Sequence, residues 1–151
     1  MKLIKCITLA TALALATDAY SSEKPPIPEK AKELLSLFTG NLVCGMYGKY
    51  STDLEAPHFP HRYFDMSKNV LEKLFSYDEV RNRSKITEPK FYEGMKSAIL
   101  ARYKKEGPAG LKVYVNEVMT DDNFTQPKWI NKCEDLLSYS NTFFETNIGS
   151  N

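Results

Sequence analysis

The sequence predicts an all-α protein, a single small bundle of four to five helices with one disulfide. Three observations lead to this prediction. Apolar residues recur at three- and four-residue steps along most of the chain, as in amphipathic helices. The one stretch that also alternates like a strand, residues 111–119, has no second strand to pair with. The length of 151 residues suits one domain, and no repeat or linker divides it.

The first nineteen residues are typical of a secretory signal peptide. Two lysines precede an uncharged, mostly apolar stretch at 6–16, which is too short to cross a bilayer as a helix. Small residues allow cleavage after Ala16 or after Ala19, and we prefer Ala19. The sequence therefore predicts a secreted or periplasmic protein, with no membrane insertion once residues 1–19 are removed.

Removal of this segment also removes Cys6 and leaves two cysteines, Cys44 and Cys133. In an oxidising compartment, two thiols in a small domain form a disulfide more often than a metal site. Zinc needs about four ligands, and only His58 and His61 remain to complete such a set. We therefore expect a disulfide between Cys44 and Cys133, and neither a metal nor a cofactor.

Residues 20–28 are rich in proline and predict an extended leader. Pro28 can occupy the first position of a helix, with Glu29 near the positive end of its dipole. Glycines at 40, 45 and 48 interrupt the apolar pattern, so the segment either breaks near Thr39 or forms a central helix buried nearly all round. We favour the central helix, with each glycine marking the close approach of a neighbour. Its apolar stripe comprises Ala31, Leu34, Leu35, Phe38 and Leu42.

The middle of the chain predicts two further helices separated by polar segments. Residues 51–61 contain two prolines and no periodicity, so we expect a loop. Helical spacing returns from Tyr63 to Phe75 and indicates a second helix of about four turns. Residues 78–88 are polar and locally basic, and we expect a solvated loop. Its basic residues are Arg81, Arg83 and Lys85.

Pro89 opens the third helix, and Gly107 followed by Pro108 is a strong signal for its end. Residues 111–119 fit either a strand or a helix, and we favour the helix. The last helix is expected to be capped by Thr125 and to carry Pro127 in its first turn. Its apolar stripe would run from Trp129 to Phe144. The helical domain would thus span 29–146 and be followed by a tail at 147–151, and the disulfide would join its first and last helices.

Several function classes have little support in the sequence. Twenty basic and nineteen acidic residues give a formal charge of +1, so the basic excess of a nucleic-acid binder is missing. No nucleophile elbow, phosphate-binding glycine loop or zinc-protease helix motif occurs. The pair His58 and His61 is separated by Pro60, which argues against a shared metal on a helix. We therefore expect a protein that is not an enzyme and does not bind nucleic acid.

Aromatic residues outside the helical stripes point to a protein partner. His58, Phe59, His61, Tyr63 and Phe64 cluster around a proline-rich loop. Aromatic side chains that lie on loops are good anchors for a partner. The alternative is that these aromatic residues cover a small core. We predict these five residues as the partner-binding site.

The segment from Lys132 to Ser140, Lys-Cys-Glu-Asp-Leu-Leu-Ser-Tyr-Ser, resembles the C-terminal element of periplasmic immunity proteins against type VI secretion amidase effectors. The helix around Cys44 is similar to the cysteine-bearing first helix of that family. The resemblance covers only the two ends of the chain, and the two cysteines are the positions that carry over. It implies a small helical protein, commonly a homodimer, that binds a peptidoglycan amidase and blocks its active-site groove.

The sequence thus predicts a secreted or periplasmic helical binding protein that neutralises a protein partner, with a cell-wall amidase toxin as the partner that the resemblance implies. Two other functions stay open at this point. One is a small secreted effector or hydrolase that uses the His58 and His61 loop. The other is an envelope stress chaperone.

Overall fold

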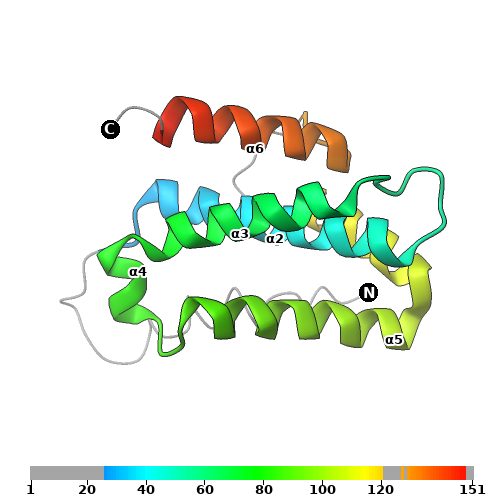
Figure 1. Cartoon of the computed structure of the whole chain (residues 1–151), viewed down its shortest axis with the longest axis horizontal. Helices are drawn as coiled ribbons and strands as arrows, with labels where there is room; N and C mark the ends of the chain where they lie inside the picture. Colours follow the sequence, from blue (N-terminus) through cyan, green and yellow to red (C-terminus); the bar gives the residue numbers. More distant parts are fainter. Residues whose placement is uncertain (1–25, 121–126, 128, 149–151) are drawn as a thin grey trace.

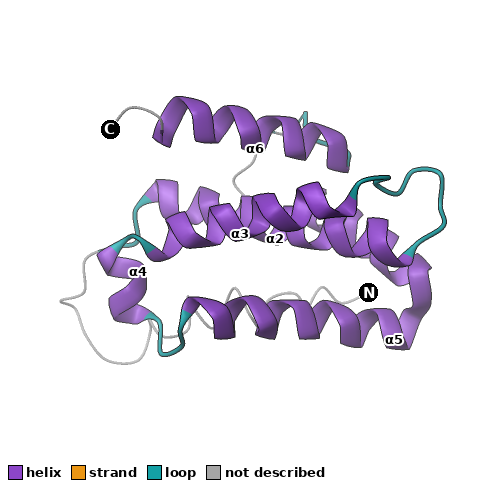
Figure 2. Cartoon of the chain, in the orientation of Figure 1, coloured by secondary structure: helices purple, strands orange, loops and turns teal. Residues whose placement is uncertain are grey.

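The computed structural model describes residues 26–120, 127 and 129–148, and this part of the chain is helical with no strand (Figures 1 and 2). The helices are α2 (Glu29–Tyr50), α3 (Pro60–Phe75), α4 (Asp78–Arg83), α5 (Glu88–Thr120) and α6 (Cys133–Ile148). The predicted all-α bundle is confirmed. The predicted signal peptide and the Thr125 cap lie outside the described residues.

Helix α2 is the centre of the bundle. Figure 1 shows α5 and α6 on opposite sides of the α2–α3 pair, and α2 packs against α3, α5 and α6. All of its residues from Ser36 to Tyr47 are buried, so no polar face remains along this stretch. A helix that is buried all round needs neighbours on every side. The prediction of a continuous central helix is therefore confirmed, and the break near Thr39 does not occur.

Two glycines of α2 allow its neighbours to come unusually close. A Cβ atom at Gly40 would lie 2.6 Å from Cδ2 of Leu136 on α6, and one at Gly45 would lie 2.8 Å from Cε1 of Phe64 on α3. Both distances are shorter than a carbon–carbon contact allows. The glycines thus mark close helix contacts, as the sequence suggested.

Helix α6 is fixed to α2 by a covalent bond and by a buried polar contact. The predicted disulfide between Cys44 and Cys133 is present, with an S–S distance of 2.05 Å. Nearby, the side-chain amide of Asn41 donates to the Ser140 hydroxyl at 2.8 Å. Ser140 in turn donates to the backbone carbonyl of Leu136. These links set the position of α6 along α2.

The boundaries of two helices differ from the sequence-based expectation because of how proline is used. Pro60 occupies the first turn of α3, so the loop ends at Phe59 and His61 belongs to the helix. Proline suits this position because the first helical N–H groups have no intrahelical partner. Pro127, in contrast, precedes α6: its carbonyl accepts a hydrogen bond from the Ile130 N–H in a turn, and α6 begins only at Cys133.

Three further segments can be compared with the sequence-based expectation: residues 78–83, residues 111–119 and the end of α6. Residues 78–83 form the short helix α4 within the segment expected to be a loop, because Val80 is buried and the acidic and basic residues suit the two ends of a helix. Residues 111–119 are helical, as favoured, and the chain kinks at Gly107, whose φ of 70° is left-handed. Helix α6 continues to Ile148, two residues beyond the predicted domain end.

The disulfide should contribute strongly to stability. It closes a segment of 89 positions, for which the chain-entropy model gives about 4.6 kcal/mol. We predict that a Cys44→Ala/Cys133→Ala double variant loses about this free energy of unfolding, measured by urea denaturation. A reductant should destabilise the wild type and leave the double variant unchanged. Equal stability of the two oxidised proteins would contradict the prediction.

Candidate functional site

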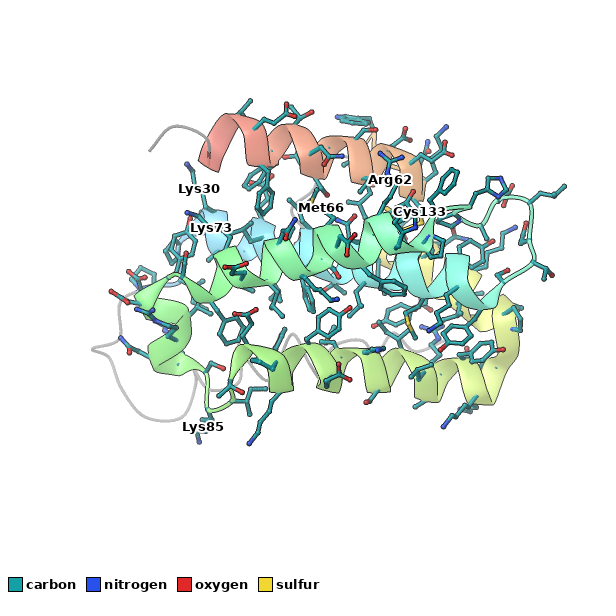
Figure 3. All side chains as sticks on the ribbon, viewed as in Figure 1. Lys30, Arg62, Met66, Lys73, Lys85 and Cys133 are labelled. Atoms are coloured by element: carbon teal, nitrogen blue, oxygen red, sulfur yellow. A yellow bond between two sulfur atoms is a disulfide. The ribbon has the colours of Figure 1, made fainter. Side chains whose placement is uncertain are left out.

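The candidate site lies at the end of the bundle where the 51–59 loop joins α2 to α3. Helix α3 begins at this end, and so does α6 (Figure 1). Figure 3 labels Arg62 of α3 and Cys133 of α6 there. The disulfide thus lies close to the loop and holds the start of α6 beside it. The sequence-predicted partner-binding residues all belong to this region.

Three of those five residues form an exposed group. His58 and His61 are exposed, and the Phe59 side chain is 59% exposed. The rings of Phe59 and His61 meet edge to face, with their centroids 6.1 Å apart. The structure therefore brings these two side chains together, with His58 on the adjoining loop.

Tyr63 and Phe64 do not belong to this exposed group. Tyr63 is 3% exposed, and its burial, together with the charge of Glu134, raises its pKa to about 12. Phe64 is partly buried and covers Gly45. Because α3 begins at Pro60, both residues sit one turn inside the helix and face the core. Tyr63 and Phe64 therefore help to cover the core, which was the alternative interpretation of the aromatic residues in this region.

The most exposed apolar side chain at this end is Leu54, which was not predicted as a site residue. It is 91% exposed, and the residues on either side of it are held in place. The Lys112 ammonium lies 2.9 Å from a carboxylate oxygen of Asp53 and 2.6 Å from one of Glu55. We call these two ion pairs, which share Lys112, the Lys112 clamp. The clamp connects the residues before and after Leu54 to α5, while the Leu54 side chain itself stays exposed to solvent.

The clamp changes the electrostatics of its members. The Glu55 backbone N–H donates to Asp53 at 3.0 Å. This bond and the ammonium of Lys112 lower the Asp53 pKa to about 2. Glu55 and Asp53 in turn raise the pKa of Lys112 above its usual value. Asp53 and Lys112 are therefore both charged over the physiological range, and their ion pair persists there.

The hydroxyl of Tyr47 lies buried beneath the loop. Among the described residues it makes no hydrogen bond of good geometry. It is nevertheless close enough to Asp53 for each group to shift the pKa of the other: burial, and then Asp53, raise the pKa of Tyr47. An unsatisfied buried hydroxyl costs about 1–3 kcal/mol. The inner side of the loop thus holds a polar group that lacks a fully formed partner.

A cleft of about 350 Å³ lies beside the clamp, between the loop, the second half of α5 and the start of α6. Its charged residues are two lysines and two glutamates, and the exposed His58 also lines it. The remainder are Leu54, three small apolar residues, two asparagines, Tyr47 and the disulfide-bonded Cys133. The lining residues are Tyr47, Leu54, Glu55, Ala56, Pro57, His58, Lys112, Val115, Asn116, Asn131, Lys132, Cys133 and Glu134.

Two features are absent from the residues that the structure describes. These residues contain no group of three or more His, Cys, Asp or Glu side chains placed to hold a metal ion. None of their helices is both long enough and apolar enough to cross a membrane. The side chains that line the candidate site are apolar, amide and charged groups.

Comparison of the chain with protein-family models, with curated proteins and with solved structures gives no match.

Gly48 is where α2 meets the loop, and it offers a test of how the loop is supported. A Cβ atom there would lie 2.5 Å from the carbonyl oxygen of Pro57. We predict that Gly48→Ala lowers the free energy of unfolding by about 1–3 kcal/mol, because the backbone of Pro57 must move. Gly94→Ala, at an exposed position of α5, is the control and should be stabilising by up to about 1 kcal/mol. Urea denaturation measures both, and equal gains would refute the close contact.

We predict that Asp53 titrates at an unusually low pH because of its contacts in the clamp. Because the Asp53 pKa is about 2 in the folded protein and 3.8 for an unperturbed carboxyl, its contribution to stability is complete above pH 3.8 and is lost as the pH falls through about 2. An NMR titration of the Asp53 carboxyl carbon should show this low midpoint. Lys112→Met should raise the midpoint toward 3.8. A native titration already complete at pH 3.8 would contradict the prediction.

Proposed function

We propose that this protein is a secreted or periplasmic binding protein that neutralises a protein partner through its 51–59 loop. The observation that carries the proposal is Leu54, a leucine that is 91% exposed between two residues fixed by the Lys112 clamp. Exposed apolar residues are common on protein surfaces. An apolar residue held out by flanking ion pairs is a better anchor than one on a flexible segment.

The energetics of binding explain why the clamp matters. Association loses free energy when a flexible loop must become ordered at the interface. The clamp and the contact of Gly48 with Pro57 order this loop before any partner arrives. Phe59 adds an exposed aromatic ring near the start of α3, and aromatic anchors are frequent among the residues that dominate binding. The loop therefore combines apolar anchors with a preformed backbone.

A peptidoglycan amidase is the partner that we propose, which makes the protein an immunity protein. Three observations support this choice: the signal-peptide pattern in residues 1–19, a disulfide that suits an oxidising compartment, and the resemblance of the Lys132–Ser140 segment to amidase immunity proteins. A homodimer is part of the same proposal, since that family is commonly dimeric.

The proposal is tested with purified protein and any secreted hydrolase that is found to be encoded next to its gene. We expect a stable complex at micromolar concentration and loss of peptidoglycan cleavage when the two are mixed in equal amounts. Absence of both effects with every neighbouring hydrolase would refute the amidase proposal. Hydrolytic activity of the protein by itself, lost in a His61→Ala variant, would replace it with an enzyme.

Leu54 gives the sharpest prediction about the interface. Leu54→Asp should weaken the complex at least about tenfold, because it places a charge where an apolar anchor is buried. Ile86→Asp is the matched control: Ile86 is also an exposed apolar residue, but it lies between α4 and α5. Calorimetric titration of both variants measures the effect. Unchanged affinity for Leu54→Asp would place the interface elsewhere.

A further inference from the structure

We propose that the cleft beside the Lys112 clamp binds a short peptide with free termini. Neither its asparagines nor the start of α6 takes part in the partner surface proposed above. The cleft shares Leu54, Glu55, Ala56, Pro57 and His58 with the 51–59 loop, but the inference does not depend on the proposed function and is tested without any protein partner.

The size and shape of the cleft suit two or three small residues. Its volume of about 350 Å³ is at the lower end of the range for small-ligand sites, about 300–1,000 Å³. Ala56, Pro57 and Val115 provide small apolar walls. A ligand with small side chains fits between such walls, whereas a large aromatic side chain would fill most of the space.

Two uncommitted carboxamides favour a peptide. Asn116 of α5 and Asn131, just before α6, both line the cleft and are exposed. Neither side chain forms a hydrogen bond with another residue that the structure describes. A carboxamide carries both a donor and an acceptor, and so does the backbone of each peptide residue. A simple anion would use the donors and leave the acceptors without a partner.

The charges of the cleft favour a ligand that carries both signs. The two lysines of the lining, Lys112 and Lys132, balance its two glutamates, Glu55 and Glu134. Lys112 is already held by the clamp, whereas Lys132 is 4.0 Å from Glu134 and mostly exposed. Lys132 and the first N–H groups of α6 can receive a carboxylate. Glu55 and Glu134 can receive an ammonium group.

Tyr47 supplies a second, buried feature of the same cleft. It lines the cleft, is 3% exposed, and its hydroxyl makes no hydrogen bond of good geometry within the described part of the chain. Such a donor gains by meeting an acceptor such as a peptide carbonyl. Tyr47 is also the one tyrosine, phenylalanine or tryptophan of the lining, and it is buried, so the exposed ring in the lining is the small imidazole of His58. The cleft is thus better suited to a peptide than to a glycan.

The test follows ¹⁵N-labelled protein by NMR during titration with the tripeptide Ala-Ala-Ala. We expect saturable shifts at the cleft, with Kd in the millimolar range or below. The same tripeptide with an acetylated N-terminus and an amidated C-terminus should bind at least about tenfold more weakly, because both charged ends are lost. Asn116→Ala should also weaken binding of the free tripeptide about tenfold.

The matched control is Asn69→Ala, at an exposed position of α3 outside the cleft, which should leave the affinity unchanged. Absence of saturable shifts up to about 10 mM tripeptide overturns the proposal. Equal binding of the capped and free tripeptides overturns it too. Binding of triacetylchitotriose in place of the tripeptide would overturn it and assign the cleft to a glycan.

Discussion

The attachment of α6 to α2 is the constraint on which the candidate site depends. The Cys44–Cys133 disulfide joins the fully buried part of α2 to the first residue of α6. The Asn41–Ser140 contact holds the same two helices about two turns further along α6. Because the start of α6 forms one wall of the cleft, the disulfide fixes that wall relative to the loop. The cleft is therefore built beside a junction that a covalent bond holds in place.

Much of the fold could be predicted from local patterns, because they depend on residues close in sequence. The central position of α2 follows from apolar residues on all its faces and from glycines that permit close contacts. Helix boundaries were less accurate. Pro60 and Pro127 are both compatible with a first helical turn, and tertiary contacts decide between the two: Ile130 is buried in a turn, so α6 starts late.

The site was harder to predict, and the reason is physical. Tyr63 and Phe64 were grouped with the aromatic residues of the loop, but α3 already begins at Pro60, and both side chains face the core from its first two turns. Lys112 lies 59 positions from Asp53, so no local pattern could reveal the clamp or the projection of Leu54. The alternation of Asp53, Leu54 and Glu55 is a signal visible only in retrospect, once a cation is known to face both carboxylates.

The clamp supports both proposed binding surfaces, and this has a thermodynamic consequence. Lys112 orders the loop that displays Leu54, and it also lines the cleft together with Glu55. A ligand in the cleft that competes for Glu55 would weaken the clamp and loosen the loop. Binding free energies are reciprocal, so a partner that requires the ordered loop would weaken the binding of such a ligand to the same degree. Two adjacent sites that share an ion pair are therefore energetically coupled. The coupling is unfavourable if the ligand breaks the ion pair, and it is not unfavourable on this account if the ligand leaves the pair in place.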